Sequence, residues 1–311
     1  MNLLITGGLG HIGSFLTRKI SESMNVSSIT VIDSMQTQRY ASLFDLPNKP
    51  KISFIEKKVK DLNKKEIINK RIDHIIHLAA TTDASGTLDQ SDSLFSNNLG
   101  STKAIIQLCG ELKIPLIFPS TTSVYGSQNR LVDEKCQELI PQSPYAKCKL
   151  EEEEEIRKAA KSGLATVILR LGTIHGASAG MRFHTAVNKF CFQAACRQPI
   201  SVWKTALNQK RPYLSLSDAA RAIAHIIDKQ IFDGEIYNVL TKNHTVQNII
   251  DSIEFVLGEK CAIDFVESPI MNQLSYEVSN TKFKLTGFEF NGSLEKDIEN
   301  TMLILNGIRN V

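Results

Sequence analysis

The chain has 311 residues, of which 42% are hydrophobic and 22% are charged, and its formal net charge at pH 7 is +3. This composition is that of an ordinary globular protein, long enough to bury a large core in one big domain or in two. Because no block of basic residues stands out, the composition argues against a nucleic-acid-binding surface, and the mild positive excess suits a small anionic substrate.

Apolar, β-branched segments alternate with helical stretches over the first 170 residues. Strands are predicted at residues 2–6, 28–33, 51–57, 72–80, 114–120 and 165–171. Near-continuous apolar strands are typical of a parallel sheet that is covered on both faces. The sequence therefore predicts an α/β fold built on a Rossmann-type doubly wound parallel sheet.

The strict alternation fades after residue 171. Residues 235–240 are predicted to be a strand that returns to the sheet. A run of glutamates at 151–155 is interpreted as a solvated helical face. Helices are predicted at 183–198, at 217–229 with Ser217 as N-cap, and at 245–258 with Thr245 as N-cap and Gly258 as stop.

Three glycines lie between the first predicted strand and the first predicted helix, in the segment TGGLGHIG at residues 6–13. Gly7 permits a tight turn, Gly10 lets a pyrophosphate approach the backbone, and Gly13 lets helix and strand pack closely. The helix N-terminus adds unpaired N–H groups and a partial positive charge. The segment predicts a dinucleotide site, to which His11 would contribute through its backbone.

Asp33 ends the second predicted strand, twenty residues after Gly13. A carboxylate there would accept hydrogen bonds from both ribose hydroxyls and repel a 2′-phosphate, which favours NAD over NADP. The alternative is an aspartate that only caps the following loop. Asp61, after the third strand, is a second candidate and would accept from the adenine amino group.

Tyr145 and Lys149 are four residues apart on a predicted helix, so their side chains share one face. A free phenol has a pKa of about 10 and is a poor base at neutral pH. The Lys149 ammonium and an oxidised nicotinamide would each favour the phenolate, which would take a proton from a sugar hydroxyl while a hydride leaves for NAD. Thr121, at the carboxyl end of a strand, would hold the same substrate oxygen.

Together these motifs resemble the extended short-chain dehydrogenase/reductases, namely the NAD-dependent epimerase/dehydratase group that acts on nucleotide sugars. The resemblance covers nearly the whole chain. The segments that carry it, in the family's order and spacing, are TGGLGHIG, VID, HLAA (77–80), NNLGST (97–102), STTSVYG (120–126), SPYAKCK (143–149), LRLGTIHG (169–176), RPYLSLSDAARAI (211–223) and IYNVL (236–240).

The resemblance implies a role for each matching residue. Thr121, Tyr145 and Lys149 would form the catalytic set, and Arg211 would grip the substrate diphosphate, as suits a guanidinium. The residues expected to contact the substrate are Thr121, Thr122, Thr173, Arg182 and Arg211, with His184 and Trp203 as further pocket candidates. The residues expected to bind the cofactor are Gly7, Gly10, His11, Ile12, Gly13, Asp33, Asp61, Leu62, Leu78, Ala79, Ala80, Asn98, Tyr145 and Lys149.

The chain departs from the family where other reactions need further groups. Dehydratases carry an Asp-Glu pair, and decarboxylases a glutamate, where this chain has Thr122 and Ser123. Reversible oxidation at one hydroxyl is the chemistry that remains, which implies an epimerase acting at carbon 4. The alternative is a nucleotide-sugar 4-dehydrogenase or reductase. A catalytically silent NAD-binding regulator is a third interpretation, against which the intact Thr/Tyr/Lys set argues.

Further departures concern the substrate side. Thr173 replaces a family asparagine, His175 a tyrosine and Ser215 a histidine. No arginine occurs between residues 267 and 280, where the family holds the nucleotide. This departure argues against UDP as the carrier and leaves GDP or another base open.

The domain organisation follows from the element order and the resemblance. Residues 1–171, with 212–242 returning to them, would form an NAD-binding domain, and 172–211 with 243–311 a smaller α/β substrate domain. Family members usually pair through two long helices, here at about 89–112 and 144–162. A homodimer is therefore expected.

Six cysteines are scattered without a C-x-x-C pair, and no His/Cys cluster has zinc spacing, so we expect no metal and free thiols. No apolar run approaches the roughly 18 residues that span a membrane, and no signal-peptide pattern precedes the first strand. We expect a cytoplasmic protein without membrane or nucleic-acid partners.

Overall fold

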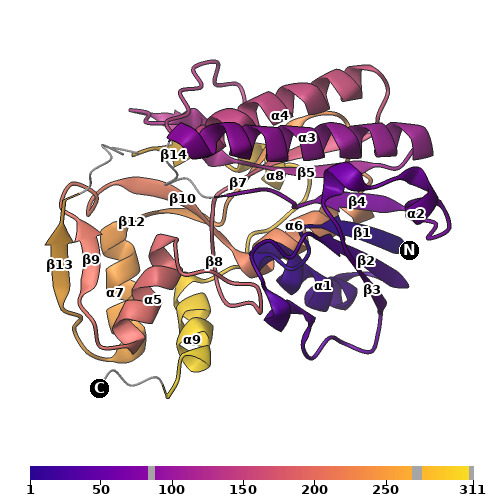
Figure 1. Ribbon diagram of the computed structural model, residues 1–311. Coiled ribbons are helices and arrows are strands. Elements are labelled where there is room, and N and C mark those ends of the chain that lie inside the picture. Colours follow the sequence, from indigo (N-terminus) through magenta and orange to yellow (C-terminus); the bar gives the residue numbers. More distant parts are fainter. Residues whose placement is uncertain (83–87, 268–274, 308–311) are drawn as a thin grey trace.

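The computed structural model describes residues 1–82, 88–267 and 275–307 (Figure 1). At its centre lies a seven-stranded sheet with the order β11-β7-β5-β4-β1-β2-β3, in which every neighbouring pair is parallel. The sheet confirms the predicted Rossmann-type α/β fold. Its strands are β1 (Asn2–Thr6), β2 (Ser28–Asp33), β3 (Lys51–Glu56), β4 (His74–His77), β5 (Leu116–Thr121), β7 (Thr166–Leu171) and β11 (Ile236–Val239).

Helices cover both faces of this sheet (Figure 1). Successive strand residues point to opposite faces, and accordingly Leu3 and Ile5 enter one apolar cluster whereas Leu4 enters the other. The helices on the face of Leu3 are α1 (His11–Ser23) and α6 (Leu216–Asp228), and those on the face of Leu4 are α2 (Lys64–Ile68), α3 (Leu88–Leu112) and α4 (Pro144–Lys161).

A second group of elements packs around its own apolar cluster, beside the carboxyl ends of the parallel strands. Figure 1 draws most of it to the left of the large sheet. Its helices are α5 (Ala186–Ala195), α7 (Val246–Leu257) and α9 (Leu294–Ile304). Its strands are β8 (Thr173–His175), β10 (Lys210–Ser215) and β12 (Lys242–Thr245) in one sheet, and β9 (Ile200–Trp203) with β13 (Ile263–Val266) in another.

Short elements complete the described chain. Strand β14 pairs with β6 in parallel, and helix α8 packs against β11. These elements are β6 (Leu131–Val132), β14 (Glu277–Val278), α8 (Thr281–Lys284) and the 3-10 helices η1 (Tyr40–Leu43), η2 (Val59–Asp61) and η3 (Thr122–Tyr125).

The predicted helix ends are partly confirmed. Helix α7 has the expected Thr245 capping box and ends at Gly258 in the left-handed conformation, with φ of +71°. The predicted N-cap at Ser217 is wrong, because α6 begins at Leu216 after Ser215. Leu216 is buried in the core and already belongs to the helix. Ser217 Oγ lies 2.9 Å from Ser215 Oγ.

The interpretation of residues 151–155 as a solvated face is wrong for two glutamates. Glu152 and Glu153 of α4 are 0% and 2% exposed, whereas Glu151 and Glu154 are exposed. Residues 149, 152, 153 and 156 share one helix face by their spacing of three and four, and this face packs on the sheet. Buried carboxylates are tolerated here because cationic side chains pair with them.

Candidate active site

The glycine turn joins β1 to α1 at the carboxyl edge of the sheet. Gly7 has φ of +65°, and a Cβ there would lie 2.6 Å from the backbone of Ala79, which follows β4. A Cβ on Gly13 would lie 2.5 Å from Gly8 Cα. The glycines therefore let three backbone segments approach closely, as the sequence predicted for a dinucleotide turn.

The first turn of α1 has no side-chain cap. Gly10 is its N-cap and supplies no side-chain cap, so the N–H groups of the first turn, which includes Ile12, lack intrahelical partners. His11 Nδ1 contacts Ser178 Oγ at 2.7 Å, and its buried Nε2 has no hydrogen-bond partner among the described residues. Burial, then the Arg39 cation, lowers the pKa of His11 to about 3. A diphosphate fits this cradle of N–H donors.

Asp33 lies at the end of β2 and caps two segments. Its Oδ2 accepts from Leu9 N at 3.1 Å and its Oδ1 accepts from Met35 N at 3.0 Å. The loop-capping interpretation is therefore part of what Asp33 does. A carboxylate has about four acceptor positions, so a ribose contact is compatible with these bonds and stays a prediction.

The other predicted cofactor residues, near the ends of β3 and β4, differ in burial. Asp61 is exposed at the end of η2, whereas Leu62 and Ala79 pack on the same apolar cluster. Leu78 packs on the cluster across the sheet, and Ala80 is half-buried in the loop after β4.

Asn98 of α3 is buried and clamps the loop after β4. Its Oδ1 accepts from Thr81 N at 2.8 Å and its Nδ2 donates to Thr81 O at 3.0 Å. Asn97 Nδ2 donates to the same Asn98 oxygen at 3.2 Å. Asn98 thus holds the segment that carries the predicted cofactor residues, and a direct contact with the cofactor stays a prediction.

Thr121 ends β5 and begins η3. Its Oγ1 accepts from Ser123 N at 3.2 Å and lies 2.9 Å from Ser123 Oγ. Thr122, predicted to contact substrate, is buried, and its Oγ1 lies 3.3 Å from Leu171 O and 3.4 Å from Tyr276 Oη. The Thr122 hydroxyl is thus already in contact with core groups. Ser123, which was not predicted as a site residue, lies beside Thr121.

Tyr145 lies in the first turn of α4, after Pro144, and the Ser143 cap accepts from Ala146 N at 3.1 Å. Helix α4 packs against β5 and η3, so Tyr145 and Thr121 belong to contacting elements. Burial raises the pKa of Tyr145 above its ordinary value, and Lys149 opposes this rise. Lys149 acts in the expected direction, but burial outweighs it.

Lys149 is buried on the same face of α4. Its Nζ lies 3.3 Å from Glu152 Oε2 and 4.5 Å from the centre of the Phe118 ring. Burial lowers the pKa of Lys149, but Glu152 and then Tyr145 raise it by more, so the net pKa lies above its ordinary value. The ammonium is charged at neutral pH, as the predicted role requires. The sequence analysis missed Glu152, although its spacing of three from Lys149 was a signal.

Arg182 joins the second group of elements to the cofactor side, since its Nη2 contacts Thr82 Oγ1 and lies 3.2 Å from His184 Nε2. Thr173 of β8 pairs in register with Tyr213 of β10. Arg211, two residues before Tyr213, pairs in register with His244.

The structure defines the surroundings of two departures from the family, His175 and Ser215, and of the pocket candidate Trp203. His175 Nδ1 lies 3.0 Å from Asp297 Oδ2 of α9. Trp203 is partly exposed at the end of β9, and Ser215 is buried. The segment 267–280, which has no arginine, is only partly described, because residues 268–274 lie outside the described part of the chain.

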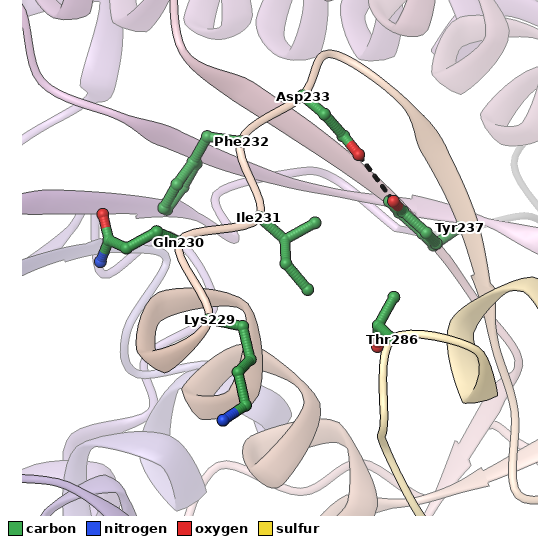
Figure 2. A pocket seen from close by; sticks show the side chains of 7 residues that line it. All are labelled: Lys229, Gln230, Ile231, Phe232, Asp233, Tyr237 and Thr286. Carbon is green, nitrogen blue, oxygen red and sulfur yellow. Dashed lines mark hydrogen bonds between the residues drawn. The ribbon is translucent and has the colours of Figure 1, made fainter.

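A separate cavity of about 500 Å³ lies between α6 and β11. Figure 2 shows its lining, in which Tyr237 Oη donates to Asp233 Oδ2 at 2.6 Å. The cavity adjoins the amino end of β11, whereas parallel sheets bind ligands at the carboxyl ends. None of the predicted site residues lines it.

Within residues 1–82, 88–267 and 275–307, no group of three or more His, Cys, Asp or Glu side chains is placed to hold a metal ion. No helix in the same ranges is both long and apolar enough to cross a membrane. All six cysteines carry free thiols.

Known proteins resemble the chain over most of its length. A trifunctional UDP-glucose 4,6-dehydratase, 3,5-epimerase and reductase of Arabidopsis thaliana is 27% identical, covering 97% of this chain and 46% of the relative. The chain thus spans about half the length of the first curated relatives it matches. An uncharacterized UDP-glucose epimerase of Bacillus subtilis is 25% identical, covering 90% of this chain and 88% of the relative.

The fold is shared with solved structures. A UDP-glucuronic acid 4-epimerase of Bacillus cereus, in complex with UDP-glucuronic acid and NAD, superposes with a TM-score of 0.87 at 24% identity, over 98% of this chain and 99% of that one. The model of the NAD dependent epimerase/dehydratase family matches residues 3–239, which include the glycine turn, Thr121, Tyr145 and Lys149. The chain therefore belongs to the NAD dependent epimerase/dehydratase family.

Proposed function

We propose that this protein is an NAD-dependent epimerase that inverts carbon 4 of a nucleotide sugar through transient oxidation. The observation that carries the proposal is that α4 carries Tyr145 four residues before a buried, charged Lys149 and packs against the strand that ends at Thr121. The glycine turn lies at the same carboxyl edge of the sheet. Relatives named as 4-epimerases support the proposal.

NAD, when bound, supplies a hydride acceptor for the carbon that carries the hydroxyl. The chain's own part is binding and proton transfer. The first turn of α1 would bind the diphosphate, and Asp33 would accept from the ribose hydroxyls. Thr121 would donate to the reacting sugar oxygen while the ionised Tyr145 removes its proton. Lys149 would stabilise the phenolate and orient the nicotinamide ribose.

Inversion requires that the oxidised sugar rotate within the site, so that the hydride can return to its opposite face. The proton then moves from Tyr145 back to the sugar oxygen, so the protein ends in its starting state. Beside Thr121, this chain offers the hydroxyls of Thr122 and Ser123, which do not act as an acid–base pair at neutral pH. This favours epimerisation over dehydration. Dehydration is one of the three activities named for the Arabidopsis relative.

The experiment is incubation of the purified protein and NAD with UDP-, GDP- and dTDP-sugars, followed by NMR of the products. Inversion at carbon 4 without net NADH would support the epimerase. Accumulation of NADH or of a keto sugar would favour the 4-dehydrogenase instead. An absence of turnover across the panel would contradict both, and the Tyr145→Phe variant is the matched control.

The domain organisation and assembly belong to the same proposal. We propose that the α5, α7 and α9 group binds the sugar nucleotide, and that β11 belongs with the cofactor-binding sheet, which it joins next to β7. We also propose a homodimer formed through α3 and α4, which lie side by side on one face (Figure 1). Sedimentation velocity distinguishes a dimer from a monomer.

Six free thiols support a reducing compartment, the cytoplasm.

A further inference from the structure

A chain of buried polar side chains runs from Lys149 through the core to His77. Lys149 Nζ lies 3.3 Å from Glu152 Oε2. Thr102 Oγ1 of α3 donates to the other carboxylate oxygen, Oε1, at 2.5 Å. His77 Nε2 lies 3.4 Å from the same Thr102 hydroxyl. All four side chains are at most 3% exposed, so no bulk water screens them.

The donors along this chain point in one direction. Ala79 N donates to Thr6 Oγ1 at 3.3 Å, and the same hydroxyl lies 2.7 Å from His77 Nδ1. Thr102 gives its only hydrogen to Glu152 Oε1, so it can only accept from His77, which places the His77 hydrogen on Nε2 and leaves Nδ1 to accept from Thr6. Burial, then Lys149, lowers the pKa of His77 to about 3, so the imidazole is neutral.

The contacts of Glu152 are those of a carboxylate. Thr102 donates to one carboxylate oxygen, and Lys149, which has only donors, faces the other. A protonated carboxyl would have to give up one of these acceptor positions. Glu152 is therefore an anion without solvent contact, and such an anion needs a cation nearby. Its cation is Lys149, the same group that would stabilise the Tyr145 phenolate.

Glu152 and a Tyr145 phenolate would both pair with Lys149. The other groups around Tyr145 and Lys149 do not remove this competition. On α4, burial and then Glu152 raise the pKa of the Cys148 thiol to about 12, so the thiol is neutral, and Glu151 is exposed. From β4 comes the neutral His77, from α3 the Thr102 hydroxyl, and from β5 the Phe118 ring. Arg182, in the segment after β8, is the other cation that acts on Tyr145.

We propose that Glu152 is a positioning residue that holds Lys149 in place and balances its charge, so that Tyr145 stays protonated until an oxidised nicotinamide brings a further positive charge. The proposal rests on the proposed function, which makes Tyr145 the base. Without Glu152 the full charge of Lys149, together with the smaller effect of Arg182, would stabilise the phenolate. With Glu152 a phenolate adds a second anion to one ammonium in a buried site.

This charge count links ionisation of Tyr145 to the oxidation state of the cofactor. An oxidised nicotinamide beside the phenol would add one positive charge and so offset the negative charge of Glu152, whereas the neutral reduced ring would not. Burial raises the pKa of Tyr145 most, Lys149 lowers it, and Glu152 opposes Lys149 by raising it.

The test is a pH titration of tyrosinate by ultraviolet difference absorbance, on full-length protein without ligand and saturated with NAD. The chain has six tyrosines, so the signal of Tyr145 is the difference between each protein and the same protein carrying Tyr145→Phe. Glu152→Gln is compared with Glu154→Gln, the same substitution at an exposed position of α4. Glu152→Asp keeps the charge and serves as the conservative variant.

We expect Glu152→Gln to increase the proton dissociation constant of Tyr145 about tenfold or more, one unit of pKa. Glu154→Gln and Glu152→Asp should stay close to the parent. An unchanged or higher pKa in folded Glu152→Gln, checked by circular dichroism, would overturn the proposal.

A second measurement needs no substitution at Glu152. The pKa of Tyr145 in the parent protein should be lower with NAD than with NADH, and the ligand-free value should lie near that with NADH. Equal values with NAD and NADH would also overturn the proposal. Neither titration uses a nucleotide sugar, so a negative sugar panel beside positive titrations would contradict the epimerase assignment alone.

Discussion

The guanidinium of Arg170 binds the carboxylate of Glu153 through two hydrogen bonds, with Nε 3.0 Å from Oε1 and Nη2 2.7 Å from Oε2. Both side chains are at most 3% exposed, and Ser120 Oγ donates to the same carboxylate at 2.5 Å. The pair joins α4 to β7, and the Ser120 bond joins it to β5. This network fixes on the sheet the helix that carries Tyr145 and Lys149.

Glu153→Gln should therefore destabilise the protein. The substitution leaves the Arg170 cation buried without its anion, which typically costs about 3–5 kcal/mol. Urea unfolding followed by circular dichroism measures the change. Glu154→Gln, at an exposed neighbouring position, should change the free energy of unfolding by less than about 0.5 kcal/mol. Equal effects of the two substitutions would show that the ion pair does not secure α4.

Tyr145→Phe should abolish turnover of the nucleotide sugar, because the variant has no phenolic oxygen to accept the proton. The affinity for NAD should stay within a few-fold, since the aromatic ring and Lys149 remain. Product NMR and calorimetric NAD binding measure the two quantities. Retained turnover would remove Tyr145 from its role as base.

Asp33→Asn should weaken NAD binding and reduce the preference for NAD over NADP. The carboxylate charge that repels a 2′-phosphate is lost, while the amide oxygen can still accept from one backbone N–H. A change of about tenfold in the ratio of the two dissociation constants corresponds to about 1.4 kcal/mol. Asp45→Asn, in an exposed part of the same loop, is the control. An unaltered ratio in Asp33→Asn would contradict its assignment to the ribose.

Gly13→Ala should lower stability and cofactor affinity together. The new Cβ would lie 2.5 Å from Gly8 Cα, so the turn must shift, and overpacking of this kind costs about 1–3 kcal/mol. Gly110→Ala in α3 meets no atom within 4 Å and should stabilise its helix by about 0.5–1 kcal/mol. Thermal unfolding with and without NAD checks both. A neutral Gly13→Ala would mean that close packing at this turn is not required.

His77 should make the protein less stable as the pH falls. Its pKa in the folded state is about 3, below the ordinary 6.5, so the unfolded chain binds more protons between these values. The free energy of unfolding should therefore lose about 1.4 kcal/mol per pH unit from this residue as the pH falls from 6.5 towards 3. His77→Gln, which does not titrate, should flatten the dependence between these pH values. Urea titrations at several pH values decide this.

Local sequence signals were sufficient for the fold and for part of the site. Each strand predicted for the parallel sheet is present, because continuous β-branched runs are buried whichever helices cover them. The turn at Gly7 and the caps at Thr245 and Gly258 depend on backbone conformation within a few residues. The pairing of Tyr145 with Lys149 follows from helix periodicity.

The environments of the charged groups were decided by the tertiary structure. Five glutamates in a row indicate a solvated face by composition, yet the docking of α4 buries Glu152 against Thr102 and Glu153 against Arg170. These partners lie 50 and 17 residues away in the chain. The amino-acid order thus determined which residues line the carboxyl edge of the sheet. Desolvation and the pairing of charges depend on which helix face meets the strands, a three-dimensional property that no local pattern contains.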